Sequence, residues 1–331
     1  MAPWTFYLEQ WSRLPPPPTG KLLDGKTVIL TGASSGIGFE TAHQLAALSP
    51  SRLILASRSL AGGAEALRSV LSKYPMATVD VWELDLGDWK SVKAFAERAQ
   101  KELEKVDLLI NNAGMALGGA SKTFWTVDGH EVVFQVNALA PLLLTLLLRP
   151  LLSAAESSRV IFVTSEVHAW VHPATIATAT KTGSIIAAMN DETRLAKNHR
   201  IQYTESKVLL QMIVRRLITA MPQTTIISVN PGLCQTNLQR SYSFAWNYAV
   251  LSSALWRWCL YRTSENGARN VTHAAVLGKD SSEYWTSCEP SASPSPFLAS
   301  GTGATATIKF WREVLKEMES IASGCTGGLS G

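Results

Sequence analysis

The sequence predicts a doubly wound α/β fold, in which helices cover both faces of a mostly parallel sheet. Short apolar runs rich in β-branched residues alternate with longer segments of helical periodicity, as in repeated βαβ units. The runs VILT, LILA, LLIN and VIFVT are apolar on both faces, as buried parallel strands must be. A glycine-rich turn follows the first run directly and opens into a helix, which is typical of the first βα unit of such a sheet.

Six strands and five crossover helices account for the chain from Lys21 to Val229. We expect strands at Thr27–Thr31, Arg52–Ala56, Val79–Leu84, Asp107–Ile110, Arg159–Thr164 and Thr225–Val229. We expect the helices between them at Ile37–Leu48, Leu60–Lys73, Asp88–Glu104, His130–Leu152 and Tyr203–Ala220. Such strands form two mononucleotide-binding halves, and ligands bind beyond the carboxyl ends of the strands. The functional residues should therefore follow the strands directly.

The chain is expected to form one folded domain with an extension at each end. Residues 1–20 contain a polyproline stretch without a packing pattern and are predicted to be an N-terminal tail. The domain proper should span residues 21–285. Residues 286–331 should hold a loop rich in Ser, Pro, Gly and Ala up to residue 306, followed by a C-terminal helix at Ile308–Ile321.

Composition argues against several classes of protein. The chain has 331 residues, of which 46% are apolar and 17% are charged. It can therefore bury a core that is stable without disulfide bonds or a structural metal ion. The net charge of +4 is spread without a dense run of Lys and Arg, so no nucleic-acid partner is expected. The four cysteines and six histidines show no ligand-like spacing. We therefore expect no metal site. We expect the cysteines to be free thiols in a reducing compartment, with disulfide pairing as the alternative.

The N-terminal residues lack the basic start and uninterrupted apolar stretch of a secretory signal. The longest apolar run, Pro141–Leu148, is much shorter than the roughly 18 to 20 residues that span a bilayer. These features predict a cytoplasmic protein without a transmembrane span. Peripheral membrane contact stays open, because many aromatic residues gather between positions 241 and 262.

The turn after the first strand has the composition of a dinucleotide-binding loop. It has the sequence Thr-Gly-Ala-Ser-Ser-Gly-Ile-Gly over Thr31–Gly38. Glycine lets the backbone turn tightly and approach a pyrophosphate, whose charge is stabilised by the amides and dipole at the helix start. An ordinary glycine-rich turn is the alternative, but the strand before it and the helix after it favour a binding loop. The expected contacts are Gly32, Ser34, Ser35, Gly36, Ile37 and Gly38.

The residue after the second strand indicates which dinucleotide is bound. A carboxylate about twenty residues beyond the glycines binds the ribose 2′-hydroxyl of NAD, whereas an arginine there accommodates the 2′-phosphate of NADP. Arg58 takes this place, and no carboxylate occurs between Arg52 and Leu60. We therefore expect NADP(H) rather than NAD(H), the alternative being that Arg58 is a solvated loop charge. Further expected contacts on the adenosine side are Asp85, Leu86, Asn112, Ala113 and Gly114.

Three side chains suited to proton transfer follow the later strands. Ser165 comes directly after the fifth strand, and Tyr203 and Lys207 stand one helical turn apart at the start of the next long helix. A tyrosine has a pKa of about 10 in water, so an adjacent ammonium that lowers this pKa would improve general acid–base catalysis near neutral pH. The Tyr-x-x-x-Lys spacing alone occurs by chance in many helices. Its position beside a dinucleotide loop predicts an acid–base pair.

Together these motifs resemble the short-chain dehydrogenase/reductase superfamily over about residues 23–277. The matching elements are the glycine motif Thr31–Gly38, Asn111–Gly114, Asn137, the set Ser165, Tyr203 and Lys207, and the turn Asn230–Gly232. The resemblance implies a Rossmann fold and an NADP(H)-dependent carbonyl reductase or alcohol dehydrogenase with a catalytic tetrad.

The resemblance also implies a role for each of these residues. Tyr203 would exchange the proton with the substrate oxygen, and Ser165 would hold that oxygen. Lys207 would bind the nicotinamide ribose and lower the pKa of the tyrosine, while Asn137 would position a water for a proton relay to solvent. On the nicotinamide side, the expected contacts are Pro231, Gly232 and, at the carboxamide, Thr236.

Within the superfamily, the segment Ser264–Ala268 and the end of the second strand are most similar to the branch related to retinol dehydrogenases. Ser165 and Tyr203 are 38 positions apart, which is longer than in many members. Residues 169–200 should therefore form an added excursion beside the site. Glu166 stands where a second serine is frequent, which leaves a role for this position in doubt.

The aromatic segment 241–262 follows the nicotinamide-side turn, where the superfamily carries its substrate lid. Its rings predict a pocket for a bulky apolar carbonyl compound, such as a terpenoid, polyketide or retinoid-like molecule of secondary metabolism. Packing of the same rings in the core is the alternative. The apolar faces around Pro141–Leu152 and Leu209–Leu217 pair subunits in many relatives, so a homodimer is one interpretation of them and core burial the other.

Two other functions stay open. A non-catalytic dinucleotide-binding regulator would keep the fold, but it would have no need of the intact acid–base pair Tyr203 and Lys207. An epimerase or dehydratase of the same fold, which recycles its bound cofactor, is disfavoured by the compact glycine spacing and by the loop after Arg58.

Overall fold

The computed structural model describes residues 4–117, 123–170, 173–197, 201–236, 261–293 and 295–329. Within them, an eight-stranded sheet has the order β3-β2-β1-β4-β5-β6-β7-β8. Strands β1 to β7 pair in parallel, and β8 pairs with β7 in the antiparallel direction. Their bounds are β1 Thr27–Thr31, β2 Arg52–Ser57, β3 Val79–Glu83, β4 Leu108–Asn111, β5 Ser158–Val163, β6 Thr224–Val229, β7 Ser282–Thr286 and β8 Glu289–Pro290.

The sheet has the predicted Rossmann topology, extended by two strands beyond β6. The six predicted strands agree with the observed ones to within one residue at each end. Strands β1 and β4 are neighbours although β2 and β3 lie between them in the sequence, so the strand order reverses at this point. Ligands of open α/β sheets bind beyond the carboxyl ends of the strands at such a switch point.

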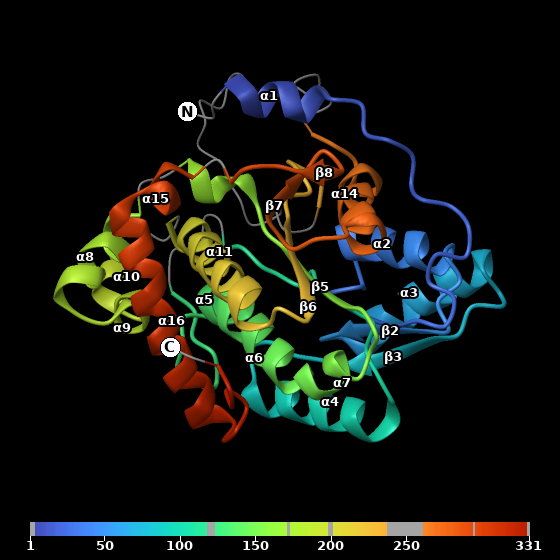
Figure 1. The fold of residues 1–331 in the computed structure, drawn as a ribbon, viewed down its shortest axis with the longest axis horizontal. Coiled ribbons are helices and arrows are strands. Elements are labelled where there is room, and N and C mark those ends of the chain that lie inside the picture. The colour runs from blue at the N-terminus through green and yellow to red at the C-terminus, as the bar shows by residue number, and fades with distance from the viewer. Residues whose placement is uncertain are drawn as a thin grey trace.

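Alternating strand residues pack into two hydrophobic clusters on opposite faces of the sheet. Figure 1 shows helices on both of these faces. Val28 and Leu30 belong to one cluster, and Ile29 belongs to the other. The first face is covered by α2 (Gly36–Ala46), α3 (Leu60–Lys73) and α14 (Ser264–Leu277). The second face is covered by α4 (Trp89–Glu102), α5 (Val132–Phe134), α6 (Ala140–Leu147), α7 (Arg149–Ser153) and α11 (Ile201–Ala220).

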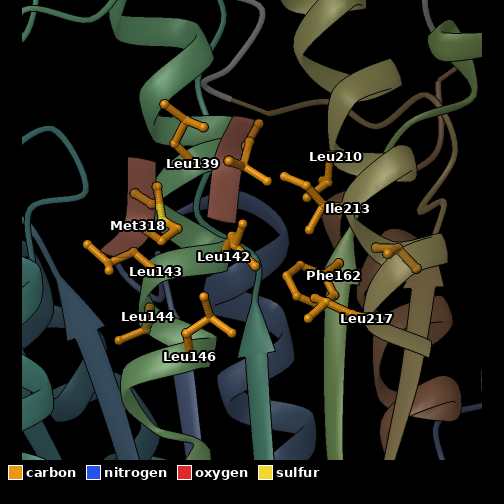
Figure 2. Close-up of a cluster of buried hydrophobic side chains, with 14 of the residues drawn as sticks. Leu139, Leu142, Leu143, Leu144, Leu146, Phe162, Leu210, Ile213, Leu217 and Met318 are labelled. Carbon is orange, nitrogen blue, oxygen red and sulfur yellow. The ribbon is translucent and has the colours of Figure 1, made fainter. Parts of the chain in front are cut away.

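A long C-terminal helix, α16 (Gly301–Ile321), packs outside the second helix layer. Figure 2 shows Leu142 of α6, Phe162 of β5 and Ile213 of α11 in the same cluster as Met318 of α16. The side chains that α16 buries include Phe310, Trp311, Val314, Leu315 and Met318. The apolar faces of α6 and α11 are therefore buried within the chain. Intramolecular packing by itself accounts for the apolar pattern that suggested subunit pairing.

Within its described residues, the predicted excursion 169–200 contains three short helices beside α16. They are α8 (Ala174–Thr182), α9 (Ile185–Met189) and α10 (Glu192–Lys197). Glu313 of α16 accepts a hydrogen bond of 2.7 Å from the Ser184 hydroxyl, before α9. Arg194 of α10 forms an ion pair of 2.7 Å with Glu205 of α11. The excursion thus bridges the C-terminal helix and the helix that carries Tyr203.

The predicted helix His130–Leu152 is divided in the structure. After α5 comes a π-helical turn at Gln135–Leu139, which continues into α6 and then α7. Pro141 and Pro150 stand in the first turns of α6 and α7. A proline has no backbone N–H for the preceding turn, which favours a new helical segment at each of these positions. The apolar periodicity passes through all the segments and therefore conceals the divisions.

The two terminal segments are more ordered than predicted. Within residues 1–20, which were predicted to be a tail, the structure has helix α1 (Trp4–Trp11), and Leu14 is buried. The predicted loop 286–306 contains β8, α15 (Pro296–Ala299) and the first turns of α16. The hydroxyl of Ser300 accepts a hydrogen bond from Gly303 N–H at 3.1 Å and caps α16 seven residues before its predicted start at Ile308. Among the described helices, none is long and apolar enough to cross a membrane.

Candidate active site

The glycine turn between β1 and α2 is shaped by close backbone packing. Gly32 and Gly36 have positive φ angles of 68° and 58°, which favour glycine. A Cβ atom on Gly32 would lie 2.8 Å from the Cα of Ala113, so this backbone runs directly against the residues after β4. A Cβ on Gly38 would overlap the carbonyl oxygen of Gly32. These glycines are needed where they stand, as the dinucleotide-loop prediction requires.

The start of α2 can receive a phosphate group. Ser35 occupies the N-cap position, but its side chain makes no capping hydrogen bond, so the first amides of the helix remain available to an anion. Ser34 lies beside the first turn of α3, because a Cβ on Gly62 would be 3.2 Å from the Cβ of Ser34. Ile37 packs under α14, with its side chain 3.2 Å from a Cβ built on Gly267. The backbone cradle and the helix start together fit the pyrophosphate of a dinucleotide.

The predicted adenosine-side residues Arg58, Asp85 and Leu86 follow the strands β2 and β3. Arg58 is exposed directly after β2, where the Ser59 hydroxyl caps α3 by accepting from Gly62 N–H at 3.2 Å. Asp85 is half-buried after β3, and its carboxylate accepts from Gly87 N–H at 2.8 Å. Leu86 is buried at the next position. Arg58 is thus exposed at the carboxyl end of β2.

Asn112 holds the glycine turn in place. Its side-chain amide donates to the carbonyl oxygens of Thr31 at 2.9 Å and Gly32 at 3.2 Å. The hydroxyl of Thr31 accepts from the backbone N–H groups of Asn112 and Ala113, each at 3.0 Å. Asn112 was predicted as an adenosine contact, and the structure shows that its amide group ties β4 to the turn after β1. Thr31 shares this task and was not singled out from the sequence.

Ser165, Tyr203 and Lys207 converge at the carboxyl end of β5. Ser165 begins a short 3₁₀ helix (Glu166–Ala169) after the strand, and its side chain is hydrogen-bonded to Tyr203 of α11. The Lys207 ammonium lies 5.7 Å from the centre of the Tyr203 ring and donates to the carbonyl oxygen of Val163 at 2.9 Å. A Cβ on Gly114, after β4, would be 3.8 Å from Lys207 Nζ. The predicted acid–base residues therefore lie at the switch point of the sheet.

Burial dominates the ionisation of the two titratable residues of this group, Tyr203 and Lys207. Desolvation raises the pKa of Tyr203 to about 12, against a smaller lowering by the hydrogen bond with Ser165. Desolvation also lowers the pKa of Lys207 to about 8. The resemblance implies that Lys207 lowers the tyrosine pKa. In this structure burial has the larger effect, and Tyr203 is a neutral phenol at neutral pH.

Asn137 lies in the π-helical turn and is almost fully buried. Its side-chain oxygen accepts from Met115 N–H at 2.8 Å, and its amide group donates to the Met115 carbonyl at 2.8 Å and to the Ser206 hydroxyl at 3.0 Å. The side chain thus joins the segment after β4 to α11 between Tyr203 and Lys207. A π-helical turn is often found at functional sites. The amide donors of Asn137 are both engaged, so its observed contacts are structural.

The nicotinamide-side turn follows β6. The side chain of Asn230 accepts from Gly232 N–H at 3.1 Å, and Gly232 has a φ of 83°. Thr236 lies against the glycine turn, since a Cβ on Gly36 would be 3.4 Å from its side chain. Most of the predicted lid segment 241–262 lies outside the described residues, which resume at Tyr261. The turn after β6 therefore contacts the glycine turn through Thr236.

His168 is a site residue that the sequence analysis did not use. It is fully buried, and its Nδ1–H donates to the carbonyl oxygen of Ser165 at 2.6 Å. Nε2 then accepts from the hydroxyl of Ser293 at 3.1 Å. Desolvation lowers the pKa of His168 to about 4, so the ring is neutral. Its position three residues after Ser165 was the signal that could have identified it as a support of the serine backbone.

Comparison with known proteins agrees with the family that the sequence resembles. Residues 26–173 match the family described as short chain dehydrogenase. The short chain dehydrogenase/reductase dmxR8 of Cryptosporiopsis sp. (strain 8999) is 33% identical over 336 residues, covering 98% of this chain and 99% of its own. The short chain dehydrogenase sor7 of Hypocrea jecorina is 37% identical over 276 residues, covering 80% and 75% of the two chains. The chain belongs to the short-chain dehydrogenase/reductase family.

Solved structures show the same fold at lower sequence identity. Salutaridine reductase from Papaver somniferum aligns with a TM-score of 0.61 at 21% identity, covering 78% of this chain and 98% of its own. The NADPH-bound carbonyl reductase from chicken fatty liver aligns with a TM-score of 0.53 at 23% identity, covering 76% and 91%. Family membership makes this chain an oxidoreductase that uses a nicotinamide dinucleotide and a small-molecule substrate. The finer assignment to the retinol dehydrogenase-related branch stays a prediction.

Proposed function

We propose that this chain is an NADP(H)-dependent oxidoreductase that interconverts a carbonyl group and a primary or secondary alcohol on a bulky apolar substrate. The observation that carries the proposal is the convergence of Ser165, Tyr203 and Lys207 beside Gly114, next to the glycine turn. A buried phenol that is hydrogen-bonded to a serine and adjacent to an ammonium is equipped for proton exchange with an oxygen atom. A dinucleotide in the cradle at the start of α2 would supply or accept the hydride.

Tyr203 is the proton donor in the reducing direction. Because burial keeps it protonated, its hydroxyl can transfer a proton to the carbonyl oxygen as the hydride reaches the carbonyl carbon. The Ser165 hydroxyl holds the same oxygen by a hydrogen bond. The Lys207 ammonium, 5.7 Å from the ring, stabilises the phenolate that remains. In the oxidising direction the phenolate accepts the alcohol proton.

The preference for NADP(H) rests on Arg58. Its exposed guanidinium follows β2, and a guanidinium can bind a phosphate through two parallel hydrogen bonds. Within the sequence Arg52–Leu60 no carboxylate would repel a 2′-phosphate. These features favour NADP(H) over NAD(H).

The proposed substrate class rests on the composition of the segment between Thr236 and Tyr261. The ends of this segment meet at the nicotinamide-side turn, where Gln235 N–H donates to the Arg262 carbonyl at 2.9 Å. The aromatic residues predicted to form the substrate pocket are Tyr242, Phe244, Trp246, Tyr248, Trp256, Trp258 and Tyr261. Their concentration favours a large apolar carbonyl compound of the terpenoid, polyketide or retinoid-like kind.

The test is a screen of ketones and aldehydes for NADPH oxidation, followed at the absorbance of the reduced nicotinamide. Replacing Tyr203 by Phe should reduce kcat by about 10²- to 10⁴-fold, because general acid catalysis contributes about that much. Binding of NADPH should persist in the variant. Equal turnover by Tyr203→Phe and the unmodified protein on an accepted substrate would exclude this mechanism.

The same screen separates the two other functions. A non-catalytic regulator would bind NADPH but oxidise it with no carbonyl compound. An epimerase or dehydratase would retain its dinucleotide through purification and convert substrate without net oxidation of added NADPH.

A further inference from the structure

The N-terminal helix α1 is bound to the nicotinamide-side turn through the side chain of Gln10. Gln10 is buried, with 6% of its surface exposed. Its Oε1 accepts from Leu233 N–H at 3.0 Å, and its Nε2 donates to the Leu233 carbonyl at 2.8 Å. One amide side chain therefore satisfies both backbone groups of a residue in the turn, 223 positions away in the sequence.

Arg262 joins the same turn to α1 from the other side. Its backbone N–H donates to the Leu233 carbonyl at 2.8 Å. Its buried guanidinium donates to the carbonyl oxygens of Glu9 and Gln10 and, at 3.2 Å, to the Ser12 hydroxyl. The Arg262 guanidinium thus joins the end of α1 to the nicotinamide-side turn.

The turn leaves little space between these side chains. A Cβ on Gly232 would lie 3.0 Å from both Gln10 Oε1 and Arg262 Nη1. Four residues further on, Thr236 lies against Gly36 of the glycine turn. A continuous series of contacts therefore leads from α1 to the loop that is proposed to bind the dinucleotide.

The segment after α1 is fastened along the domain as well. Glu9 accepts from the Thr286 hydroxyl, at the end of β7, at 3.2 Å. The carbonyl oxygen of Pro16 accepts a hydrogen bond of 2.9 Å from His273 Nε2 of α14. Figure 1 shows α1 lying across the end of the sheet that carries β7 and β8, and close to α14. Glu9 and Pro16 therefore connect this segment to the end of β7 and to α14.

We propose that Gln10 and Arg262 are positioning residues of the cofactor site, through which α1 holds the turn Pro231–Thr236 against the glycine turn and raises affinity for the nicotinamide half of the dinucleotide. This inference rests on the proposed NADP(H) function. The adenosine half is expected to bind on the other side of the glycine turn, at Arg58 and Asp85, which follow β2 and β3. Loss of the Gln10 contacts should therefore affect one half of the cofactor selectively.

The experiment compares two ligands on the Gln10→Ala variant. NADPH carries the nicotinamide half, whereas 2′,5′-ADP carries only the adenosine half with its 2′-phosphate. Dissociation constants are measured by fluorescence or calorimetry, without a substrate. We expect the Kd of NADPH to rise about tenfold, as the loss of two buried hydrogen bonds implies, and the Kd of 2′,5′-ADP to stay unchanged.

Leu8→Ala is the matched control, because Leu8 lies on the same helix with 54% of its surface exposed. It should leave both constants unchanged. If Gln10→Ala lowers Tm below the assay temperature, Gln10→Glu serves instead, since it keeps the acceptor for Leu233 N–H and removes the donor. Equal weakening of both ligands, or of neither, would overturn the inference. Failure of the unmodified protein to bind NADPH would instead overturn the proposed function.

Discussion

At the scale of single residues, Glu166 is a buried carboxyl directly after Ser165. Only 6% of its surface is exposed. Desolvation and the proximity of Glu9 raise the pKa of Glu166 to about 7, although Arg262 acts in the opposite direction. The sequence placed this glutamate where the family often has serine, and left its role in doubt. The structure places it between Ser165 and the residues that fasten α1.

The raised pKa of Glu166 predicts a pH-dependent stability. Below its ordinary pKa of 4.5 the carboxyl is protonated in both the folded and the unfolded chain, so its burial does not lower the free energy of unfolding. As pH rises from 4.5 to 7, the unfolded chain releases a proton that the folded chain retains, so the free energy of unfolding falls. Above pH 7 the free energy of unfolding is lowered by the full cost, about 3 kcal/mol.

Glu166→Gln removes this titration and keeps the size of the side chain. Its Tm should exceed that of the unmodified protein by about 4 °C or more at pH 8, and the difference should shrink towards zero at pH 5. Differential scanning calorimetry across this range provides the measurement. A difference that is constant with pH would show that Glu166 does not carry the effect.

Arg58 is the residue that should select the cofactor. Arg58→Ala is expected to raise KM for NADPH by about 10- to 100-fold and to leave KM for NADH nearly unchanged, because a charge-assisted hydrogen bond is worth about 1.5 to 3 kcal/mol. Arg68→Ala is the control, since Arg68 is an exposed arginine of α3. Steady-state kinetics with both cofactors decides the matter. A parallel loss with NADH would mean that Arg58 does not recognise the 2′-phosphate.

At the scale of elements, the glycine turn and α2 form a unit whose geometry admits no added side chain at Gly38. Gly38→Ala would place a methyl group on the carbonyl of Gly32 and near the Asn112 amide. We expect a loss of about 2 kcal/mol, seen as a Tm lower by about 4 to 8 °C, because overpacking displaces backbone here. NADPH, which should raise the Tm of the unmodified protein, should no longer do so.

Gly301→Ala is the matched control for this substitution. Gly301 opens α16, and a Cβ there would meet no atom within 4 Å. Its Tm and its response to NADPH should equal those of the unmodified protein. An unchanged response to NADPH in Gly38→Ala would contradict the assignment of the turn as the cofactor loop.

The strands and most helices were predictable because each depends on local pattern. A buried parallel strand must be apolar along its whole length, so β1 to β6 were located to within one residue. The division of the predicted helix His130–Leu152 was not predicted, because hydrophobic periodicity continues through the π-helical turn. The capping of α16 by Ser300 was missed for a related reason, since its first turns, Gly301 to Thr307, are small and weakly patterned.

At the scale of the whole molecule, α16 covers the helices whose apolar faces suggested a dimer. Because α6 and α11 are buried beneath it, we expect that the full chain does not dimerise through these two helices. Removal of residues 301–331 should expose these faces and cause self-association or aggregation. Size-exclusion chromatography with light scattering measures both proteins. A dimer of the full chain whose interface maps to α6 and α11, or a truncated chain that stays monomeric, would contradict this view.

The sequence by itself determined the sheet, the glycine turn and the residues proposed for proton transfer. It could do so because the fold brings the carboxyl ends of parallel strands together, so Ser165 and Tyr203 had to meet once the strands were located. Only the tertiary structure decided the docking of α1, the covering by α16 and the raised pKa of Tyr203. Gln10 and Leu233 are 223 positions apart, and no local pattern encodes such a contact. Burial likewise depends on which segments cover a side chain, and a linear sequence does not display that directly.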